Sequence, residues 1–389
     1  MKKSVLTCFC AFALILCMVS CQKQNANPQT TGDSESKTDA VTDLNATQNP
    51  PQTEENFDMD PVTYPLNHST KGIKILGERC LSSDMQINCD WTGSGLEFDI
   101  KHAGGDMTFT ASATANCYFR AYVDNTEWKN TDDSVFYTVT SAQTSIVLKD
   151  VPEGEHRIKL IKVTGYTLAR AQLLDVTFAG LIKETAPTDN NLYIEFVGDS
   201  ICCAWGTIGG HTGAYTDQDG TLAYPLIVSE ALNADYSVTA LSGQGLLCGE
   251  PGMKKGYLYE SALRSTEQQY DFARQANVVV INIGTNDYTY RNTQNIDEAS
   301  FQAAYLEFLQ MVAAKNGDDC VIICLYNCMN ETFGEAIKQA VKDFGGAAEN
   351  AYAFQMNRGN SGGAGHPDIA EQAGYAEFLE ECIKELLAE

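Results

Sequence analysis

The chain contains few basic residues and, after residue 21, no long apolar segment. Its 26 lysine and arginine residues stand against 51 aspartate and glutamate residues, so the formal net charge is −25. Nucleic-acid binding requires a basic face toward the phosphates, and this charge balance therefore excludes nucleic acid as a partner. The apolar content of 44% is that of a globular protein, and 389 residues are enough for two or three domains.

An apolar run near the start of the chain, residues 5–19, follows Lys2 and Lys3 and is too short for a membrane span. It leads into the sequence Met-Val-Ser-Cys, which ends at Cys21 and resembles a bacterial lipoprotein signal. In such signals the cysteine is lipidated and becomes the new N-terminus. We therefore expect residues 1–21 to be a lipoprotein signal, with Cys21 as a lipid anchor to a membrane at the bacterial cell surface or in the periplasm. The alternative is an ordinary secretory signal with an incidental cysteine, and both interpretations predict an exported protein.

Composition divides the rest of the chain into three parts. Residues 22–62 are polar, with almost no large apolar side chains, so we expect a disordered linker that cannot offset its ordering entropy. Residues 63–186 carry β-branched and aromatic runs about every ten residues with turn residues between them, which predicts an all-β sandwich or jelly-roll domain. Within it, residues 96–100 and 107–109 are expected to be separate strands joined by a Gly-Gly-Asp turn.

Residues 187–389 alternate between strand-like and helix-like segments. This pattern predicts an α/β domain with a five-stranded parallel sheet and helices on both faces. The expected strands are residues 192–197, 236–241, 278–283, 321–326 and 351–356. The expected helices are residues 224–232, 261–275, 299–314, 333–344 and 367–387.

Four polar positions lie where such a sheet would bring them together. Ser200 follows the first strand, Gly243 the second and Asn286 the third, whereas His366 precedes the last helix. The carboxyl ends of parallel strands share one edge, so we expect these four residues to meet there. Considered alone, Ser200 also fits a helix N-cap. The other three positions favour a reaction site.

The residue types at these positions fit acyl transfer. A serine hydroxyl needs a general base, and a histidine has the appropriate pKa near neutrality. Backbone N–H groups of Ser200 and Gly243 and the side-chain amide of Asn286 can donate hydrogen bonds to a tetrahedral oxyanion. The sequence thus predicts Ser200 as nucleophile and His366 as base.

In combination these blocks resemble those of the GDSL/SGNH hydrolases, over about residues 191–389. The blocks are GDS at 198–200, Gly243, GTND at 284–287 and HP at 366–367. The resemblance implies the same roles for Ser200, Gly243, Asn286 and His366. The Gly-x-Ser-x-Gly elbow of the α/β-hydrolases is not used, so this is a different serine-hydrolase plan.

A narrower resemblance extends from about residue 73 to the C-terminus. The stretches IEFVGDSICCAW at 194–205, LSGQGL at 241–246 and WTGSGLEF at 91–98 are similar to carbohydrate esterase family 2 acetylesterases. Membership of this family implies removal of acetyl groups from plant-wall glycans such as acetylated xylan and glucomannan. Two alternatives stay open: an SGNH esterase or lipase acting on acyl lipids, and a glycan-binding surface lipoprotein without catalysis.

One position departs from the pattern of the wider superfamily. Most relatives carry an aspartate three residues before the histidine, where this chain has Gly363. Some family 2 members work with a serine–histidine dyad. We therefore expect a neutral acceptor, most simply a backbone carbonyl of residues 359–365, to orient His366. Asp368 is the acid to test first, although it fits the first turn of a helix better.

Several other residues are weaker candidates. Trp205, Tyr224 and Asp287 are candidate substrate contacts, with core packing as the alternative for the two aromatic side chains. His211 follows a glycine-rich loop near Ser200, and a plain surface histidine is the alternative. The sequence implies neither a metal nor an organic cofactor. In particular, three cysteines near one strand are interpreted as buried thiols rather than metal ligands: Cys320, Cys324 and Cys328.

Overall fold

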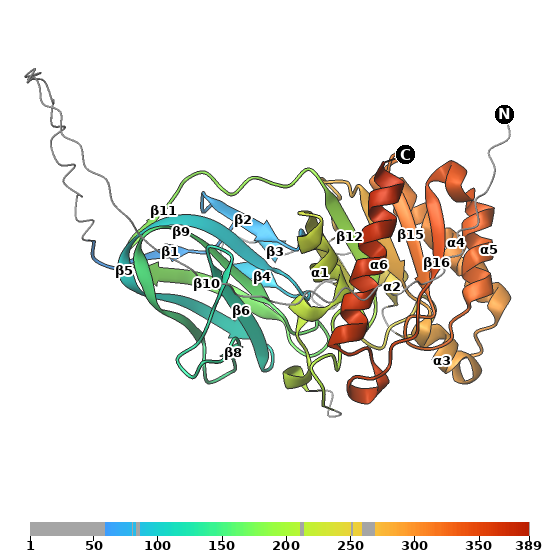
Figure 1. Cartoon of the computed structure of the whole chain (residues 1–389), viewed down its shortest axis with the longest axis horizontal. Helices are drawn as coiled ribbons and strands as arrows, with labels where there is room; N and C mark the ends of the chain where they lie inside the picture. The colour runs from blue at the N-terminus through green and yellow to red at the C-terminus, as the bar shows by residue number, and fades with distance from the viewer. Residues whose placement is uncertain are drawn as a thin grey trace, which may run out of the picture. The chain divides into compact units, whose positions relative to one another are not determined.

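The computed structural model describes residues 59–79, 81–82, 86–210, 214–249, 252–258 and 269–388 (Figure 1). These residues belong to one compact unit, Asn56–Glu389. The expected signal with Cys21, most of the expected linker, and His211 lie outside the described residues. No helix in the described ranges is both long and apolar enough to cross a bilayer.

The N-terminal half of the described chain is a set of antiparallel strands. They share one hydrogen-bonded sheet system with the order β3-β4-β10-β5-β9-β6-β7, with β1, β2, β8 and β11 paired at its sides. The strands are β1 (Val62–Pro65), β2 (Ile73–Leu76), β3 (Leu81–Ser82), β4 (Ile87–Cys89), β5 (Gly95–Ala113), β6 (Cys117–Val123), β7 (Thr126–Trp128), β8 (Tyr137–Val139), β9 (Ser145–Lys162), β10 (Ala171–Phe178) and β11 (Gly180–Ile182). Alternate side chains of these strands enclose a separate apolar core, as the all-β prediction requires.

The two longest strands differ from the expectation of short separate strands. β5 runs through the Gly-Gly-Asp segment without a turn, and its pairing with β9 only shifts register between Gly105 and Met107. Gly104 and Gly105 have φ values of +89° and +107°, so the segment is a bulge that bends the strand. The rings of Phe98 and Phe109, one on each side of the bend, lie 6.2 Å apart in the same core. The bend thus lets both ends of one continuous strand contribute to the same apolar core.

The C-terminal half contains the predicted parallel sheet of five strands. Its order is β13-β12-β14-β15-β16, and all four strand pairs are parallel. The strands are β12 (Tyr193–Gly198), β13 (Asp235–Ala240), β14 (Val278–Asn282), β15 (Val321–Tyr326) and β16 (Ala351–Gln355). β12, β14 and β15 are buried along their whole length, as expected for strands covered on both faces.

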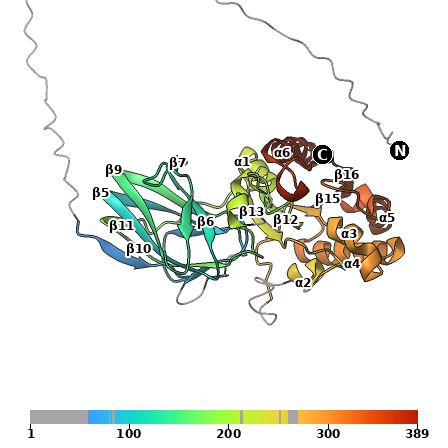
Figure 2. The ribbon, with the colours of Figure 1, turned by 90° about the horizontal axis from the view of Figure 1, so that it is seen from below.

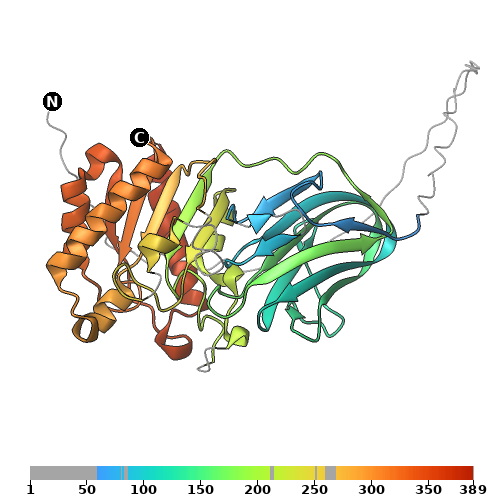
Figure 3. The same ribbon diagram turned by 180° about the vertical axis from the view of Figure 1, so that it is seen from behind.

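Helices cover both faces of this sheet (Figure 2). The helices are α1 (Tyr224–Ala231), α2 (Met253–Gly256), α3 (Thr285–Gln294), α4 (Glu298–Asn316), α5 (Gly334–Phe344) and α6 (Ile369–Leu387). α1 and α6 share one apolar core with the sheet, and α4 and α5 share the other (Figure 3). Successive β14 residues alternate between the two cores, so the sheet is the middle layer of an α/β/α arrangement.

One helix prediction was wrong in the described residues, and two helices, α2 and α3, were not predicted. The expected helix at residues 261–275 is absent from its described part, residues 269–275, where Tyr270 and Phe272 pack in irregular backbone. Residues 261–268 lie outside the description. α3 was missed because its sequence, TNDYTYRNTQ, is almost entirely polar and therefore shows no apolar helical pattern.

A buried arginine from the antiparallel half joins the two sheets. Arg79, which follows β2, is 2% exposed, and its Nε and Nη2 atoms donate to Glu195 Oε1 at 3.0 and 2.6 Å. Nη1 donates to the Tyr257 carbonyl, and the guanidinium lies 4.3–5.0 Å from the ring centroids of Tyr257, Tyr270 and Phe272. Since Glu195 is on β12 of the parallel sheet, this contact links the two sheets. The proposed domain boundary after residue 186 stays a prediction.

Candidate active site

Ser200 lies on a tight turn immediately after β12. The turn needs glycine at position 198, because a Cβ there would lie 2.1 Å from Cys202 Sγ. Asp199 Oδ1 accepts from the Ile201 N–H at 3.0 Å, and the Ser200 carbonyl accepts from the Trp205 N–H at 3.0 Å. These bonds hold Ser200, which is 6% exposed, in a fixed position at the carboxyl edge of the sheet.

His366 reaches Ser200 from the other end of the domain. Its Nε2 lies 2.9 Å from Ser200 Oγ, although the two residues are 166 positions apart. Its Nδ1 lies 3.3 Å from the carbonyl oxygen of Ala364. With Nδ1–H donating to Ala364, Nε2 is left as an acceptor for the serine proton. Burial lowers the pKa of His366, against the two backbone hydrogen bonds of Ala364 and Gly363 that favour its protonation.

A carboxylate holds the loop before His366 in place. Glu371 accepts hydrogen bonds from the N–H groups of Asn360, Ser361 and Asp368 at 2.9–3.2 Å, and from Ser361 Oγ at 2.8 Å. Burial acts to raise the pKa of Glu371, but these bonds outweigh burial and lower it. Asp368 Oδ1 in turn accepts from the Glu371 N–H, which completes a capping box at the start of α6. Asp368 therefore caps the helix, as its position in the first turn suggested.

Gly363 occupies its position because no side chain fits there. A Cβ at residue 363 would lie 1.8 Å from the carbonyl oxygen of Gly210 and 3.1 Å from the Cα of Gly206. The Gly363 N–H donates to the Gly206 carbonyl at 2.8 Å, so the loop before His366 and the loop after Ser200 are in direct backbone contact. This close approach gives a physical reason for the missing aspartate.

Gly243 and Asn286 lie beside the serine turn. Gly243 has φ +80° and its Cα faces open space, and within the described residues the N–H groups of Ser200 and Gly243 have no acceptor. Asn286 differs from the expectation of a free donor. Its Nδ2 donates to the Gln244 carbonyl at 2.9 Å and to Asp199 Oδ2 at 3.2 Å. The amide is thus anchored between the two loops that carry Gly243 and Ser200.

Asp199 is a buried carboxyl group that the motif search did not single out for chemistry. It is fully buried, and burial raises its pKa from 3.8 to about 7. The hydrogen bond from the Ile201 N–H opposes this rise, and the charge of Asp287 adds to it. Near neutral pH a substantial share of Asp199 is therefore protonated, and a protonated carboxyl is a weaker acceptor for the Asn286 amide than a carboxylate.

Asp287 and Tyr224 are not substrate contacts. Asp287 is 0% exposed, and its two oxygens accept from the N–H groups of Leu246, Leu247 and Cys248 at 2.7–2.9 Å. Burial raises its pKa against these three bonds. It therefore shapes the loop after Gly243, and it does not face a ligand. Tyr224 is likewise 0% exposed and packs in the core of α1 and α6, which was the alternative for this side chain.

Trp205 remains a candidate substrate contact. Its ring centroid lies 6.3 Å from that of His366, and its side chain is half-buried. The three cysteines near β15 are buried thiols: Cys320 and Cys324 belong to the core under α4 and α5, and Cys328 to the core under α1 and α6. In the described ranges no three His, Cys, Asp or Glu side chains are grouped to hold a metal ion.

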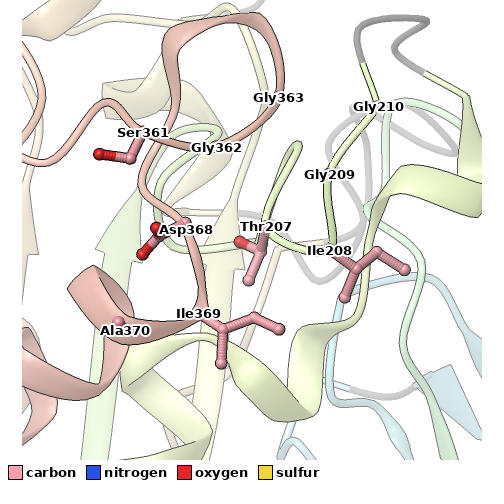
Figure 4. A pocket seen from close by; sticks show the side chains of 10 residues that line it. All are labelled: Thr207, Ile208, Gly209, Gly210, Ser361, Gly362, Gly363, Asp368, Ile369 and Ala370. Carbon is pink, nitrogen blue, oxygen red and sulfur yellow. The ribbon is translucent and has the colours of Figure 1, made fainter.

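A cavity of about 500 Å³ adjoins the histidine loop (Figure 4). Its lining residues are Thr207–Gly210, Ser361–Gly363 and Asp368–Ala370. Figure 4 shows the glycines of the two loops, 209–210 and 362–363, on opposite sides of the opening. Neither Ser200 nor His366 lines the cavity, so it is a neighbour of the reacting pair and not the place where that pair acts.

Comparison with known proteins agrees with this geometry. Residues 194–361 match the family model described as GDSL-like Lipase/Acylhydrolase. The chain therefore contains a GDSL-like acylhydrolase domain. Its homologues include esterases, and its structural neighbours include a family two carbohydrate esterase. The similarity to that neighbour covers 82% of this chain, so it extends beyond residues 194–361.

Three relatives illustrate the range of similarity. Cellulase/esterase CelE of Acetivibrio thermocellus is 28% identical over 333 residues, which are 81% of this chain and 40% of that protein; the chain thus spans less than half of this relative. An acetylxylan esterase / glucomannan deacetylase of Cellvibrio japonicus is 23% identical over 300 residues, covering 72% of this chain and 81% of the relative. A family two carbohydrate esterase from Clostridium thermocellum, solved with cellohexaose, has a TM-score of 0.73 at 27% identity, covering 82% and 99% of the two chains.

Sequence reasoning missed two residues of this site, Asp199 and Glu371. Asp199 lies in the nucleophile block, but its burial depends on how three loops meet. The Ala364 carbonyl lies within residues 359–365, where a backbone carbonyl was expected to orient His366. The sequence could not specify which carbonyl, because every residue has one. The role of Glu371 at the helix start could have been predicted, since Asp-x-x-Glu before an apolar periodic segment is a capping-box pattern. This pattern would have predicted the helix cap but not the hydrogen bonds that Glu371 accepts from residues 360 and 361.

Proposed function

We propose that this GDSL protein is a serine esterase that removes O-acetyl groups from plant cell-wall polysaccharides such as acetylated xylan and glucomannan. The observation that carries the proposal is the 2.9 Å contact between Ser200 Oγ and His366 Nε2 at the carboxyl edge of the sheet. The names of the curated relatives supply the substrate class, since two of them are acetylxylan esterases / glucomannan deacetylases.

The geometry supports a two-step acyl transfer. Ser200 Oγ attacks the acetyl carbonyl carbon while His366 Nε2 takes the hydroxyl proton. As the tetrahedral intermediate collapses, the carbon–oxygen bond to the sugar breaks and His366 returns the proton to the sugar oxygen. An acetyl ester on Ser200 remains. Water then attacks this ester with His366 again as base, and acetate leaves with Ser200 restored.

The oxyanion of each intermediate requires donors close to Ser200. The unpartnered N–H groups of Ser200 and Gly243 serve first, because they need not exchange a bond within the protein. Asn286 contributes when the hydrogen that it shares with Asp199, the longer of its two bonds at 3.2 Å, turns to the substrate. The Gln244 carbonyl keeps the amide oriented meanwhile.

Acetate release from a panel of acetylated polysaccharides tests this function. Wild-type protein is expected to release acetate, and Ser200→Ala, with an unchanged circular dichroism spectrum, is expected to release none because no other group forms the acyl-enzyme. Parallel rates on acetyl and octanoyl esters separate a glycan deacetylase from an esterase of acyl lipids, which needs a long apolar pocket. Faster turnover of the octanoyl ester, or full activity of Ser200→Ala, would overturn the proposal.

We also propose that the protein is exported and anchored through a lipid on Cys21. The support is the basic start, the short apolar run and the cysteine that follows it. Two acyl chains would hold the enzyme at a membrane at about 0.8 kcal/mol per buried CH₂. The intact mass of the mature protein is expected to begin at Cys21 with lipid attached, and Cys21→Ala is expected to abolish that species. A mature N-terminus elsewhere would contradict the anchor.

A further inference from the structure

Exposed apolar side chains are concentrated beside the candidate active site. Among the described residues, the large apolar side chains that are clearly exposed are Val62, Leu181, Leu247, Tyr290, Ile369 and Leu387. Leu247 follows Gly243 by four positions, Tyr290 follows Asn286 by four, and Ile369 follows His366 by three. Half of these side chains therefore accompany the three blocks that meet Ser200. An exposed apolar group beside a polar site usually indicates a binding surface.

Tyr290 lies on the same face of α3 as Asn286. Residues four apart on a helix are neighbours with Cβ atoms about 6 Å apart. Side chains on a helix also tilt toward its N-terminus, so the ring of Tyr290 covers the turn that carries Asn286. At 45% it is the most exposed aromatic side chain in the described part of the chain. The exposed ring is thus expected to lie over the turn of α3 that carries Asn286, the candidate oxyanion donor.

The neighbouring tyrosine of the same helix shows that this exposure is particular to Tyr290. Tyr288 packs against Phe333 with ring centroids 5.3 Å apart, and the Arg291 guanidinium stacks 3.8 Å from its ring. Its hydroxyl donates to Glu331 at 3.1 Å. Within the described residues the Tyr290 ring has no such contact, and the side-chain hydrogen bond at this residue is the one that its backbone carbonyl accepts from Thr293 Oγ1. Tyr288 therefore packs within the protein, whereas the Tyr290 ring can contact a ligand.

Leu247 lies in the loop after Gly243, and its backbone is hydrogen-bonded to α3. Its N–H donates to Asp287 Oδ1 at 2.7 Å, and Asp287 lies in the first turn of the helix that carries Tyr290. The Leu247 side chain itself is 41% exposed. Because one buried carboxylate joins this loop to α3, Leu247 and Tyr290 belong to two backbone segments that are in direct contact.

We propose that Leu247 and Tyr290 form a subsite that packs against the apolar face of a pyranose ring in the acetylated glycan. A sugar ring presents C–H groups on its faces and hydroxyls on its edge, so an aromatic and an aliphatic side chain complement its face while leaving the hydroxyls in water. This inference rests on the proposed function and adds the part of the molecule that recognises the chain beyond the acetyl group. The subsite uses no charge, as suits a neutral polysaccharide.

The test compares a glycan with a small ester. For wild type and each variant, kcat/KM is measured on acetylated xylo-oligosaccharides and on 4-nitrophenyl acetate, and the ratio of the two values is the readout. Tyr290→Ala is expected to lower this ratio about ten-fold, mainly through KM on the oligosaccharide, the effect of roughly 1.4 kcal/mol of lost contact. Tyr290→Phe keeps the ring and is expected to keep the ratio. Leu181→Ala, an equally exposed site on β11, is the matched control and is expected to leave the ratio unchanged.

A binding measurement gives a second readout without turnover. In the Ser200→Ala background, calorimetry with unacetylated xylo- or manno-oligosaccharides is expected to show weaker binding when Tyr290→Ala is added. An unchanged ratio and unchanged affinity for Tyr290→Ala would overturn the subsite, as would a loss with Tyr290→Phe as large as with Tyr290→Ala. Wild-type protein that turns over the small ester but releases no acetate from any glycan would instead refute the proposed substrate.

Discussion

The carbonyl oxygen of Ala364 lies 3.3 Å from Nδ1 of His366, two residues further along the same loop. A neutral carbonyl stabilises the imidazolium less than a carboxylate does, and burial lowers the pKa of His366 further. The contacts of the ring nitrogens with Ser200 Oγ and with the Ala364 carbonyl thus form a serine–histidine dyad in which a backbone carbonyl orients the histidine.

The acid limb of kcat/KM is therefore expected below pH 6.5. His366 must be neutral to accept the serine proton, so activity falls only when the pH drops through its lowered pKa. Asp368→Asn, which preserves an N-cap, is expected to change activity less than ten-fold, whereas His366→Ala abolishes it. Steady-state kinetics between pH 4 and 9 measure both. An acid limb above 6.5, or a loss of several orders of magnitude in Asp368→Asn, would restore a triad.

Gly363→Asp is expected to damage the enzyme and not to restore a missing acid. The new Cβ would lie 1.8 Å from the Gly210 carbonyl, so the two loops must separate. Overpacking of this kind lowers the free energy of unfolding by about 1–3 kcal/mol. Urea denaturation together with kcat measures the effect, and Gly365→Asp is a matched control because a Cβ at Gly365 meets no atom within 4 Å, although its φ of +72° adds some strain. Higher activity in Gly363→Asp would contradict this prediction, because it would show that the two loops can separate without loss of function.

Asp287→Asn is expected to loosen the loop after Gly243. The amide keeps one acceptor oxygen but turns an N–H₂ toward backbone N–H groups that now donate to a carboxylate. Hydrogen bonds to a charged group contribute about 1.5–3 kcal/mol, so we expect a loss of stability of that order. Faster hydrogen exchange at Leu246–Cys248, with a fall in kcat, is the specific signature. Unchanged exchange at these three amides would refute the role.

Asp199 is expected to make the protein less stable as the pH rises from about 4 to 7. Its folded pKa of about 7 lies above its unfolded value of 3.8, so the folded state holds a proton that the unfolded state has lost. The stabilising contribution is full below pH 3.8 and disappears as the pH passes 7, for a total of at most about 4 kcal/mol. Subtracting the stability curve of Asp199→Asn from that of wild type isolates this slope from other carboxylates. A flat difference would contradict the raised pKa.

Removing either partner of the buried pair Arg79–Glu195 is expected to lower stability by about 3–5 kcal/mol, since the remaining charge is buried without compensation. The double variant Arg79→Met/Glu195→Gln is expected to lose less than the sum of the two single variants. The half-buried pair Arg157–Asp99, at 2.8 Å, serves as control, and Arg157→Met is expected to change stability by no more than about 1 kcal/mol. Additive losses in the double variant would show that the two side chains act independently.

The sequence was sufficient to predict the parallel strands and the meeting of the reacting residues, because both follow from the apolar pattern and the parallel topology. Strands buried on both faces read as continuous apolar runs, so β12, β14 and β15 were found within one residue of their bounds. Because parallel strands share a carboxyl edge, the meeting of Ser200 with His366 followed from strand order and needed no distance information.

The errors have a common physical origin, since each depends on contacts between distant segments. Nothing in a polar motif reveals that Asp287 turns inward to three backbone amides, or that Tyr224 is enclosed by α1 and α6. α3 forms although its residues lack an apolar stripe, and the bend of β5 turns an apparent hairpin signal into a bulge. Local patterns indicate which segments fold, but tertiary contacts decide where single polar groups point.

The position of Arg79 also has a consequence for the order in which the protein matures on the ribosome. Arg79 precedes its partner Glu195 by 116 residues and its acceptor at Tyr257 by 178. Until those residues have been synthesised, the guanidinium cannot form these hydrogen bonds, so we expect the segment after β2 to stay solvated while the chain grows. The antiparallel strands emerge first, and the contact of Arg79 with the parallel sheet can form only after that sheet has been synthesised. We therefore expect the two sheets to join late in translation.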